Sequence, residues 1–361
     1  MLIQKFTTLF KDVTRQGTKI PKEEYLTHGK NIIIDQGQDI IAGYTNCEDG
    51  ILKKIPAIVF GDHTRIIKYV DTPFFLGADG VKVLKCTDKN ANYRYLYYAL
   101  KNAHIPNTGY NRHFKWLKEI TINYPDKNRQ NDIVNILDKL EYIIKMKSQE
   151  LDKFDELIKA RFVEMFGDPQ DSKSKWKKST IEKCCTLKSG KTLPRNIENE
   201  GGNIPYVKVK DMNSLENTTY ITTSTRFVSD KTANKSIFPV GTVIFPKRGG
   251  AIGTNKKRLT KVPICADLNI MGVIPDNTRI SSYYLFEYFN MVDLNTLNNG
   301  SSVPQINNKD INPLNINIPP LSLQNEFANF VHQVDKSKVA VQKSLDETQK
   351  LFDSLMQEYF G

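Results

Sequence analysis

Apolar side chains recur along two stretches of the chain at alternating steps of four and three residues. In the first stretch the positions are Ile133, Leu137, Leu140, Ile144, Lys147, Leu151, Phe154, Ile158, Arg161 and Met165. In the second they are Phe327, Val331, Val334, Lys338, Val341, Leu345, Thr348, Phe352, Leu355 and Tyr359. Sustained spacing of this kind, with charged residues on both sides, predicts the seam of a coiled coil. Lys147, Arg161 and Lys338 interrupt the seam, and polar residues at such positions fix register at some cost in stability.

The two stretches are copies of one sequence at a constant offset. Gln-Asn-Asp-Ile at 130–133 matches Gln-Asn-Glu-Phe at 324–327, and Glu-Met-Phe-Gly at 164–167 matches Glu-Tyr-Phe-Gly at 358–361, so that 324 − 130 = 194 and 361 − 167 = 194. A period this long excludes a solenoid and indicates one large unit made twice. A protein with internal two-fold character suits a target that is itself nearly two-fold, such as duplex DNA.

Each stretch has the start and stop signals of a helix. The first follows Pro125 and ends at Gly167, and the second follows Pro319-Pro320 and ends at Gly361. About 35 residues at about 1.5 Å each give a rod near 50 Å long. We expect the two rods to pair with each other. The sequence fixes neither a parallel nor an antiparallel arrangement, and we predict the antiparallel one, which relates the two halves of the chain by a pseudo-dyad.

A second apolar stripe lies beside the seam. Its members are Ile136, Ile143 and Phe162, with counterparts Phe330 and Met356. The seam already supplies the apolar surface that a contact between two helices needs, so this stripe is additional apolar surface. Packing onto the domains of this chain and docking of another subunit both remain open.

Two longer segments of different composition accompany the helices. Both contain short β-rich runs, such as 55–60 and 203–209, separated by glycine, asparagine and proline, with a helix near 93–101 and another near 282–289. We therefore predict an α+β fold with two α+β target-binding domains separated by two long helices in an antiparallel coiled coil. The expected boundaries are 1–125 for the first domain, 126–167 for the central helix, 168–320 for a linker and the second domain, and 321–361 for the last helix.

Composition and charge narrow the class of protein. The chain has 361 residues, 39% of them hydrophobic, which is typical of a folded protein of two or three domains. It has no apolar run long enough to cross a membrane, and its first residues lack the order of a signal peptide, so a cytoplasmic protein is expected. The net charge of +11 favours a polyanionic partner, although a merely basic protein would show the same excess.

Catalytic and cofactor motifs are missing. The five cysteines lack the spacing of a zinc site, and no Gly-rich Lys-Ser/Thr phosphate loop or GxGxxG element occurs. The Asn-Pro-Pro-aromatic tetrapeptide of DNA amino-methyltransferases is absent, and a nuclease metal motif is not supported. We expect a chain that is not an enzyme and that holds no cofactor or metal.

Loops with basic, amide and hydroxyl side chains are better represented, and such groups can address phosphates and base edges. In the first domain the candidate DNA contacts are Gln36, Gln38, Tyr44, His63, Thr64, Arg65, Arg112 and His113. In the second domain they are Lys208, Lys210, Lys247, Arg248, Thr254, Asn255, Lys256 and Gln305. For any one of them a solvated surface residue is the alternative.

Several motifs resemble one known family. They are 31–38 (Asn-Ile-Ile-Ile-Asp-Gln-Gly-Gln) with 41–44, 60–65 (Phe-Gly-Asp-His-Thr-Arg), 165–169 (Met-Phe-Gly-Asp-Pro) and 318–326 (Ile-Pro-Pro-Leu-Ser-Leu-Gln-Asn-Glu). Together with the repeat they span nearly the whole chain, which resembles the DNA-specificity subunit of a type I restriction-modification system. One departure is the short first domain, which begins almost directly at Phe10.

The resemblance implies two target-recognition domains, one for each half of a split, asymmetric double-stranded DNA site, held apart by an antiparallel helical spacer. It also implies two methyltransferase subunits that carry S-adenosylmethionine and modify adenine, and restriction subunits that use ATP and Mg²⁺. Two other classes stay open: a stand-alone DNA methyltransferase or nuclease, and a coiled-coil scaffold that does not bind DNA.

Overall fold

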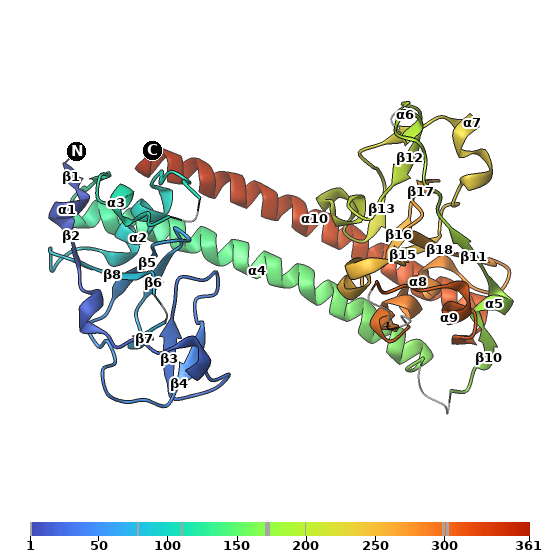
Figure 1. The fold of residues 1–361 in the computed structure, drawn as a ribbon, viewed down its shortest axis with the longest axis horizontal. Helices are drawn as coiled ribbons and strands as arrows, with labels where there is room; N and C mark the ends of the chain where they lie inside the picture. The colour runs from blue at the N-terminus through green and yellow to red at the C-terminus, as the bar shows by residue number, and fades with distance from the viewer. Residues whose placement is uncertain are drawn as a thin grey trace. The chain divides into compact units, whose positions relative to one another are not determined.

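The fold consists of two compact units, each with a globular α+β domain and parts of both long helices (Figure 1). The computed structural model describes residues 2–77, 79–109, 111–169, 174–198, 200–297, 300 and 303–361. The first unit is Met1–Gln149 with Gln342–Gly361, and the second is Glu150–Val341. The predicted α+β class is confirmed.

The globular part of the first unit contains a four-stranded antiparallel sheet, a three-stranded sheet and one strand pair. The four-stranded sheet has the order β2(Phe10–Asp12), β8(Val81–Cys86), β5(Ala57–Gly61), β6(Ile67–Val70). The three-stranded sheet has the order β4(Gly43–Thr45), β3(Asn31–Ile34), β7(Phe74–Leu76), and β3 runs parallel to β7. The pair is β1(Ile3–Lys5) with β9(Thr121–Asn123). The helices are α1(Phe6–Leu9), α2(Tyr93–Asn102) and α3(Phe114–Leu117), with 3-10 turns at Thr14–Gln16 and Lys22–Glu24.

The globular part of the second unit repeats this plan with one more strand in the larger sheet. The larger sheet has the order β11(Cys185–Ser189), β18(Ile270–Pro275), β15(Val243–Pro246), β16(Arg258–Thr260), β13(Tyr220–Ile221). The smaller sheet has the order β14(Phe227–Val228), β12(Ile204–Val207), β17(Cys265–Ala266), and the strand pair is β10(Lys177–Thr180) with β19(Asn315–Ile318). The helices are α5(Ile181–Cys184), α6(Arg195–Glu198), α7(Asp230–Ala233), α8(Ser282–Met291) and α9(Asn308–Ile311). The 3-10 turns are at Asp211–Asn213, Leu215–Asn217, Asn234–Ser236, Gly249–Thr254 and Leu294–Leu297.

The two globular domains share one topology although their sequences differ. In each, the central strand of the smaller sheet has one antiparallel and one parallel neighbour: β3 lies between β4 and β7, and β12 lies between β14 and β17. In each, a ten-residue helix, α2 or α8, follows the last strand of the larger sheet. The cores are mostly aliphatic and aromatic, as strands buried on both faces require. The internal two-fold character therefore extends beyond the repeated helices.

The two long helices are α4(Lys127–Phe166) and α10(Leu321–Phe360), of 40 residues each. Gly167, just past the end of α4, has a φ of 81°, a backbone conformation that glycine adopts without steric cost. All ten predicted seam positions in each helix are buried or half-buried. Between 142 and 157 in α4, the only residues that are not exposed are Ile144, Lys147, Leu151 and Phe154. The predicted seam is thus confirmed along the middle of the helix.

Within each unit the two helices run antiparallel, as predicted. In the first unit, the guanidinium of Arg129 near the start of α4 lies 5.6 Å from the ring centroid of Tyr359 near the end of α10. In the second unit, Arg161 near the end of α4 forms an ion pair of 3.3 Å with Glu326 near the start of α10.

The stripe beside the seam divides between two environments. Phe162 and Met356 are buried in the domain cores, with exposures of 0% and 5%, whereas Ile136 and Ile143 are 40% and 39% exposed. One part of the stripe therefore packs onto the chain's own domains, and the other part faces solvent in this single chain.

The repeated sequence fixes each globular domain to the long helices in the same way. Gln130 and Gln324, which the offset of 194 relates, are both buried, and the side-chain oxygen of each accepts a hydrogen bond from the N-cap residue of a domain helix. In the first unit the donor is the backbone amide of Asn92 (3.0 Å), the N-cap of α2. In the second it is that of Ser281 (2.7 Å), the N-cap of α8. Asn92 and Ser281, whose amides donate to these glutamines, therefore occupy equivalent positions in the two domains.

Aromatic residues complete the attachment. The Tyr95 hydroxyl donates to the carbonyl of Asn123 (2.7 Å), and the Tyr284 hydroxyl donates to the carbonyl of Asn317 (2.9 Å). The ring of Tyr95 lies 5.1 Å from that of Phe360, and the ring of Tyr284 lies 4.8 Å from that of Phe166. Each domain is thereby held by the start of one long helix and the end of the other.

Candidate nucleic-acid interface

Backbone hydrogen bonds show which loops of the two domains are equivalent. After β5, the amide of Asp62 donates to the carbonyl of Gly80 (2.6 Å), and the carbonyl of Asp62 accepts from the amide of His113 (2.8 Å). After β15, the amide of Lys247 donates to the carbonyl of Asn269 (2.8 Å), and the carbonyl of Lys247 accepts from the amide of Ile306 (3.0 Å). These matching bonds pair Asp62 with Lys247, so the next residues, His63 and Arg248, are equivalent. By the same bonds Arg112 is equivalent to Gln305.

A second pair of loops follows the central strands of the smaller sheets. The amide of Gly77 donates to the carbonyl of Ile34 (2.7 Å), and the amide of Asp267 donates to the carbonyl of Val207 (2.9 Å). The loop after Ile34, which carries Gln36 and Gln38, is therefore equivalent to the loop after Val207, which carries Lys208 and Lys210.

In the first domain, Gln36 joins three loops. Its side-chain amide donates to the carbonyl of Asp79 (3.1 Å), its side-chain oxygen accepts from the amide of His63 (3.2 Å), and its own carbonyl accepts from the Thr64 hydroxyl (2.6 Å). Gly80 makes this approach possible: its φ is 95°, and a Cβ there would lie 2.8 Å from the Gln36 oxygen. The structure thus brings Gln36, His63 and Thr64 together.

Two further predicted residues of the first domain are exposed near this group. Gln38 lies on the same loop as Gln36. Arg112 comes directly before His113, whose backbone amide donates to the carbonyl of Asp62. Lys19, and to a smaller extent Arg112, lower the pKa of the fully exposed Asp79 carboxyl below its usual value. Arg112 therefore lies near the loop of Asp79 and belongs to the same surface.

Three predicted residues of the first domain do not fit this surface as direct contacts. His113 is fully buried, and a ring nitrogen lies 3.0 Å from the carbonyl of Asp62, so its role is to hold the loop. Arg65 has a φ of 65°, and its guanidinium donates to the carbonyl of Ile105 (3.2 Å). Tyr44 lies on β4, where its ring stacks on that of His28 at 6.5 Å.

In the second domain, Lys247 and Arg248 occupy the place of Asp62 and His63. The ammonium of Lys247 donates to the Ser189 hydroxyl (2.7 Å), and burial, followed by the charge of Arg248, lowers its pKa. Arg248 is exposed, and its backbone bridges to Gln305. Both side chains of this pair are cationic, whereas the first domain has an aspartate and a histidine at the equivalent positions.

The sequence analysis missed three residues at this edge: Ser189, Lys191 and Asn269. Ser189 and Lys191 flank Gly190, whose amide donates to the carbonyl of Ile270 (3.0 Å), and Lys191 is exposed. A Ser-Gly-Lys sequence at the end of a strand is a signal that could have pointed to Ser189 and Lys191. Asn269 is visible only from the backbone bond that it makes with Lys247.

Most of the remaining predicted residues of the second domain form contacts within the chain. Lys208 forms an ion pair with Glu198, which is 7% exposed, whereas Lys210 is exposed. The Lys256 ammonium donates to the side chain of Asn213. The Thr254 hydroxyl caps its own turn by donating to the carbonyl of Ala251 (2.7 Å).

Asn255 does not fit a direct contact. Its side-chain oxygen accepts from the ammonium of Lys257 (2.7 Å) and from the amide of Leu294 (2.9 Å), and its φ is 52°. Asparagine tolerates this left-handed conformation better than most residues. The residue therefore shapes the loop, and burial lowers the pKa of its partner Lys257 to about 8.

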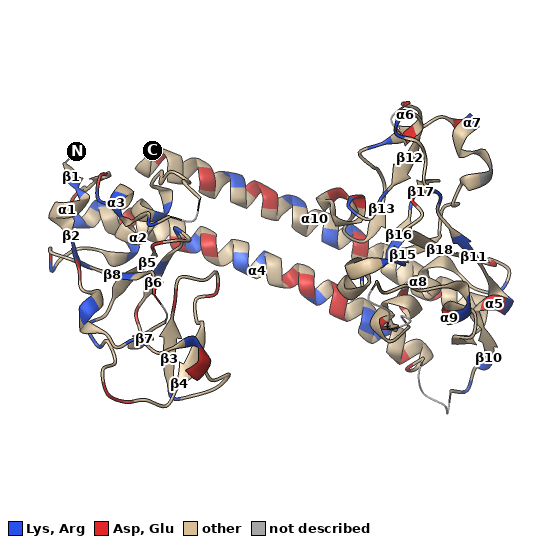
Figure 2. Ribbon diagram, in the orientation of Figure 1, with Lys and Arg blue, Asp and Glu red and all other residues tan. Residues whose placement is uncertain are grey.

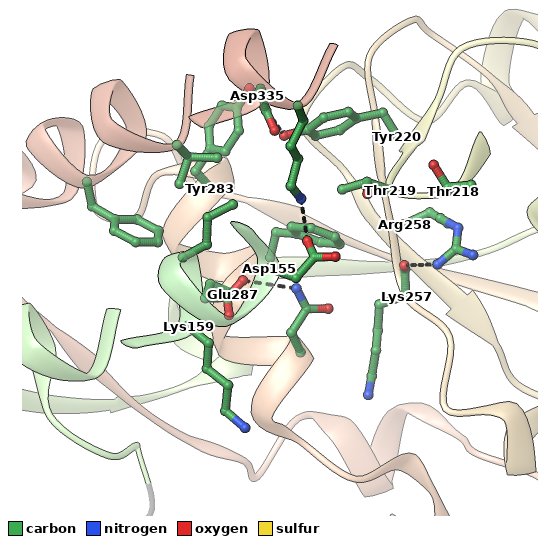
Figure 3. A pocket seen from close by; sticks show the side chains of 16 residues that line it. Asp155, Lys159, Thr218, Thr219, Tyr220, Lys257, Arg258, Tyr283, Glu287 and Asp335 are labelled. Atoms are coloured by element: carbon green, nitrogen blue, oxygen red, sulfur yellow. Dashed lines mark hydrogen bonds and ion pairs between the residues drawn. The ribbon is translucent and has the colours of Figure 1, made fainter. Parts of the chain in front are cut away.

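A pocket of about 280 Å³ lies within the second unit, with Lys257 and Arg258 in its lining (Figure 3). Charged and hydrogen-bonded groups cross it: Lys338 pairs with Asp155, the Tyr220 hydroxyl donates to Asp335, and the Asn290 amide donates to Glu287 (3.0 Å). Burial raises the pKa of the Glu287 carboxyl. The first two contacts link α10 with α4 and with β13, which indicates a structural role. Over the described parts of the chain, no cluster of side chains suited to a metal ion is found.

The equivalent surfaces of the two domains differ in charge. In the first, the residues are amides, a hydroxyl, an imidazole and one arginine; in the second, lysine and arginine predominate. Figure 2 shows that both long helices carry cations and anions interspersed, so neither forms a continuous basic stripe. Among the predicted residues, the second domain therefore presents more cationic side chains than the first.

The family model described as "Type I restriction modification DNA specificity domain" matches residues 8–153 and 173–348. The chain belongs to this family. Its members are the DNA-specificity subunits of type I restriction-modification systems and are the non-catalytic subunits of those enzymes. The match covers both globular domains together with most of both long helices, as the repeat requires.

Individual relatives agree with this assignment. The specificity subunit of the EcoR124I/EcoR124II type I restriction enzyme of Escherichia coli is 24% identical over 330 residues, covering 84% of this chain and 79% of the relative. The crystal structure of a type I S subunit from M. genitalium is similar in fold over 100% of this chain and 96% of that one, with 19% identity and a TM-score of 0.62. A structure titled for the assembly and conformational transition of the type I system covers 99% of this chain and 95% of its own, at 14% identity and a TM-score of 0.58.

No helix in the described ranges of this specificity subunit is long and apolar enough to span a bilayer.

Proposed function

We propose that this specificity subunit reads a double-stranded DNA site in two unlike halves, one with each globular domain. The observation that carries the proposal is the hydrogen-bond equivalence of the two loop sets. Asp62 and Lys247 occupy the same place in the same topology, yet the side chains around them differ in charge and in hydrogen-bonding groups. One scaffold presenting two different sets of side chains suits a bipartite, asymmetric target.

The proposed contacts are the predicted residues whose side chains reach the loop surfaces. In the first domain they are Gln38, His63, Thr64 and Arg112, with Gln36 holding the loops in place. In the second they are Lys208, Lys210, Lys247, Arg248, Lys256 and Gln305, joined by Lys191. Arg248 suits the two acceptors on the major-groove edge of guanine, and Lys210 suits a phosphate.

We propose that the chain keeps the division of residues expected from the sequence: domains at 1–125 and 168–320, joined by helices at 126–167 and 321–361. Part of the linker, 170–173, lies outside the described residues. The helices would set the distance between the two halves of the DNA site.

The family acts within the type I restriction-modification complex. For this chain we propose two methyltransferase subunits, each carrying S-adenosylmethionine, and restriction subunits that use ATP and Mg²⁺ where the system has them. The chain itself would hold no cofactor, and the complex would work in the cytoplasm on the cell's own DNA. The exposed Ile136 and Ile143 on α4 offer a docking face for a methyltransferase subunit.

Methylation mapping tests the proposal. The chain would be co-expressed with the methyltransferase of its own system in a host that lacks adenine methylation, and the genome would be sequenced for modified bases. We expect one motif made of two different halves with an unread gap, and no methylation when either protein is absent. A continuous motif would contradict the proposal, and so would methylation by the chain alone, which would favour a stand-alone enzyme.

A further inference from the structure

The loop at 35–42, between β3 and β4, is held by contacts at its base. The Asp35 carboxylate accepts from the amide of Gly37 (2.7 Å). The Lys68 ammonium, whose side chain is only 4% exposed, lies 3.6 Å from Asp35 and donates to the carbonyl of Asp39. The amide of Ala42 donates to the carbonyl of Ile33 (2.9 Å), which closes the loop. The backbone at the tip is thus ordered before any target binds.

The side chains at the tip of this loop remain available. Gln38 is exposed, and among the described residues no hydrogen bond engages its side chain. Ile40 is 68% exposed and Ile41 is 37% exposed, so neither contributes its full surface to the core. The fixed loop therefore presents one free amide and one bare aliphatic group two residues apart.

The charge of the loop restricts what it can contact. Residues 35–42 include two aspartates and no lysine or arginine. A loop without a cation is unsuited to phosphates, whereas an amide and an aliphatic side chain suit base edges. In the major groove, glutamine matches N6 and N7 of adenine, and an apolar group matches the methyl of thymine. The equivalent loop of the second domain carries Lys208 and Lys210 at the corresponding part, which suits a different target.

We propose that the tip of the 35–42 loop reads one A·T base pair in the major groove. Gln38 forms two hydrogen bonds with adenine, and Ile40 covers the 5-methyl group of the paired thymine. The inference rests on the proposed function and deepens it, because it assigns a base pair and a groove to one loop of the first domain and adds Ile40 as a specificity-determining residue.

Base analogues test each contact separately. The purified complex of the chain with its methyltransferase subunit would be titrated with duplexes carrying the mapped site, in which each thymine in turn is replaced by uracil. Loss of one buried methyl should weaken binding about fourfold at one pair. Replacing the partner adenine by 7-deazaadenine removes the N7 acceptor, and we expect a loss of about tenfold at the same pair.

Variants assign the losses to the two side chains. Ile40→Ala should bind the natural site about as weakly as wild type binds the uracil duplex, and uracil should cost it nothing more. Gln38→Ala should be insensitive to 7-deazaadenine at that pair. Leu215→Ala, which trims an aliphatic side chain that is 91% exposed in the second domain, should keep both penalties.

The outcomes separate this inference from the function on which it rests. If specific binding holds but Ile40→Ala or Gln38→Ala keeps the full wild-type penalty at every pair, the assignment of the loop is overturned and the proposed function stands. A wild-type complex that is indifferent to every substitution also overturns the assignment. If the complex shows no preference for its mapped site over unrelated duplex, both proposals fail.

Discussion

At the scale of single residues, Arg248 is the strongest candidate for direct readout of a base. It is exposed, follows a strand end fixed by the hydrogen bonds of Lys247, and carries a guanidinium that can donate twice to guanine. We predict that Arg248→Ala relaxes one position in one half-site and weakens binding there by about 1–3 kcal/mol. Binding competition with singly substituted duplexes measures this effect.

A matched lysine distinguishes base readout from charge. Lys210→Ala should weaken binding by a similar factor on all sequences and reduce its salt dependence, as loss of a phosphate contact does. If Arg248→Ala instead weakens all duplexes equally, the arginine is a phosphate contact and its assignment to a base is wrong.

The residue types alone could not distinguish side chains that would contact DNA from side chains that stabilise the loops. His113, Arg65 and Asn255 have side chains suited to DNA, yet the structure uses them inside loops. The partners are backbone carbonyls for His113 and Arg65 and the backbone amide of Leu294 for Asn255. Folding brings these groups close from distant segments, which a single sequence does not reveal. Conversely, Asn269 and Ser189 reach the surface only because β18 lies between β11 and β15.

At the scale of elements, the long helices were predictable and the sheets were not. A seven-residue pattern is local, and α4 and α10 follow it with every seam position at least half-buried. The parallel pairing of β3 with β7 and of β12 with β17 joins segments about forty to sixty residues apart and leaves no periodic trace. Observed contacts were also needed to establish that the two helices run antiparallel, because the spacing of the seam is compatible with parallel and antiparallel pairing alike.

The glutamines of the repeat supply a prediction at this scale. Gln130→Leu or Gln324→Leu should each lower the free energy of unfolding by about 1–3 kcal/mol, because a buried backbone amide at the N-cap of α2 or α8 loses its acceptor. Urea unfolding of the full chain followed by circular dichroism measures the loss. Gln349→Leu, at an exposed position of α10, is the matched control and should change it by less than about 0.5 kcal/mol. Equal effects of all three substitutions would show that the loss of stability does not come from the attachment of the domains to the long helices.

At the scale of the whole molecule, the repeat explains how one chain carries two different readers. Three pairs of groups that attach the domains to the helices recur after 194 residues: Gln130 and Gln324, Asn123 and Asn317, Phe166 and Phe360. The loops that would touch DNA do not recur. Selection can therefore change the loops of one domain without disturbing its attachment, which is consistent with the low identity to relatives of the same fold.

The length of the helices should then set the gap between the two halves of the DNA site. Removing one heptad from both helices, residues 144–150 and 338–344, keeps the seam and the repeat in register. Seven residues shorten each helix by about 10 Å, which corresponds to about three base pairs of duplex DNA. Deleting residues 144–150 alone shifts one helix against the other and should abolish methylation.

Methylation mapping of the doubly shortened variant, co-expressed with its methyltransferase, is the most direct test of this account. We expect the same two half-sites as in wild type, separated by a shorter gap. Methylation of the wild-type motif with an unaltered gap would contradict it, because the helices would then not determine the spacing.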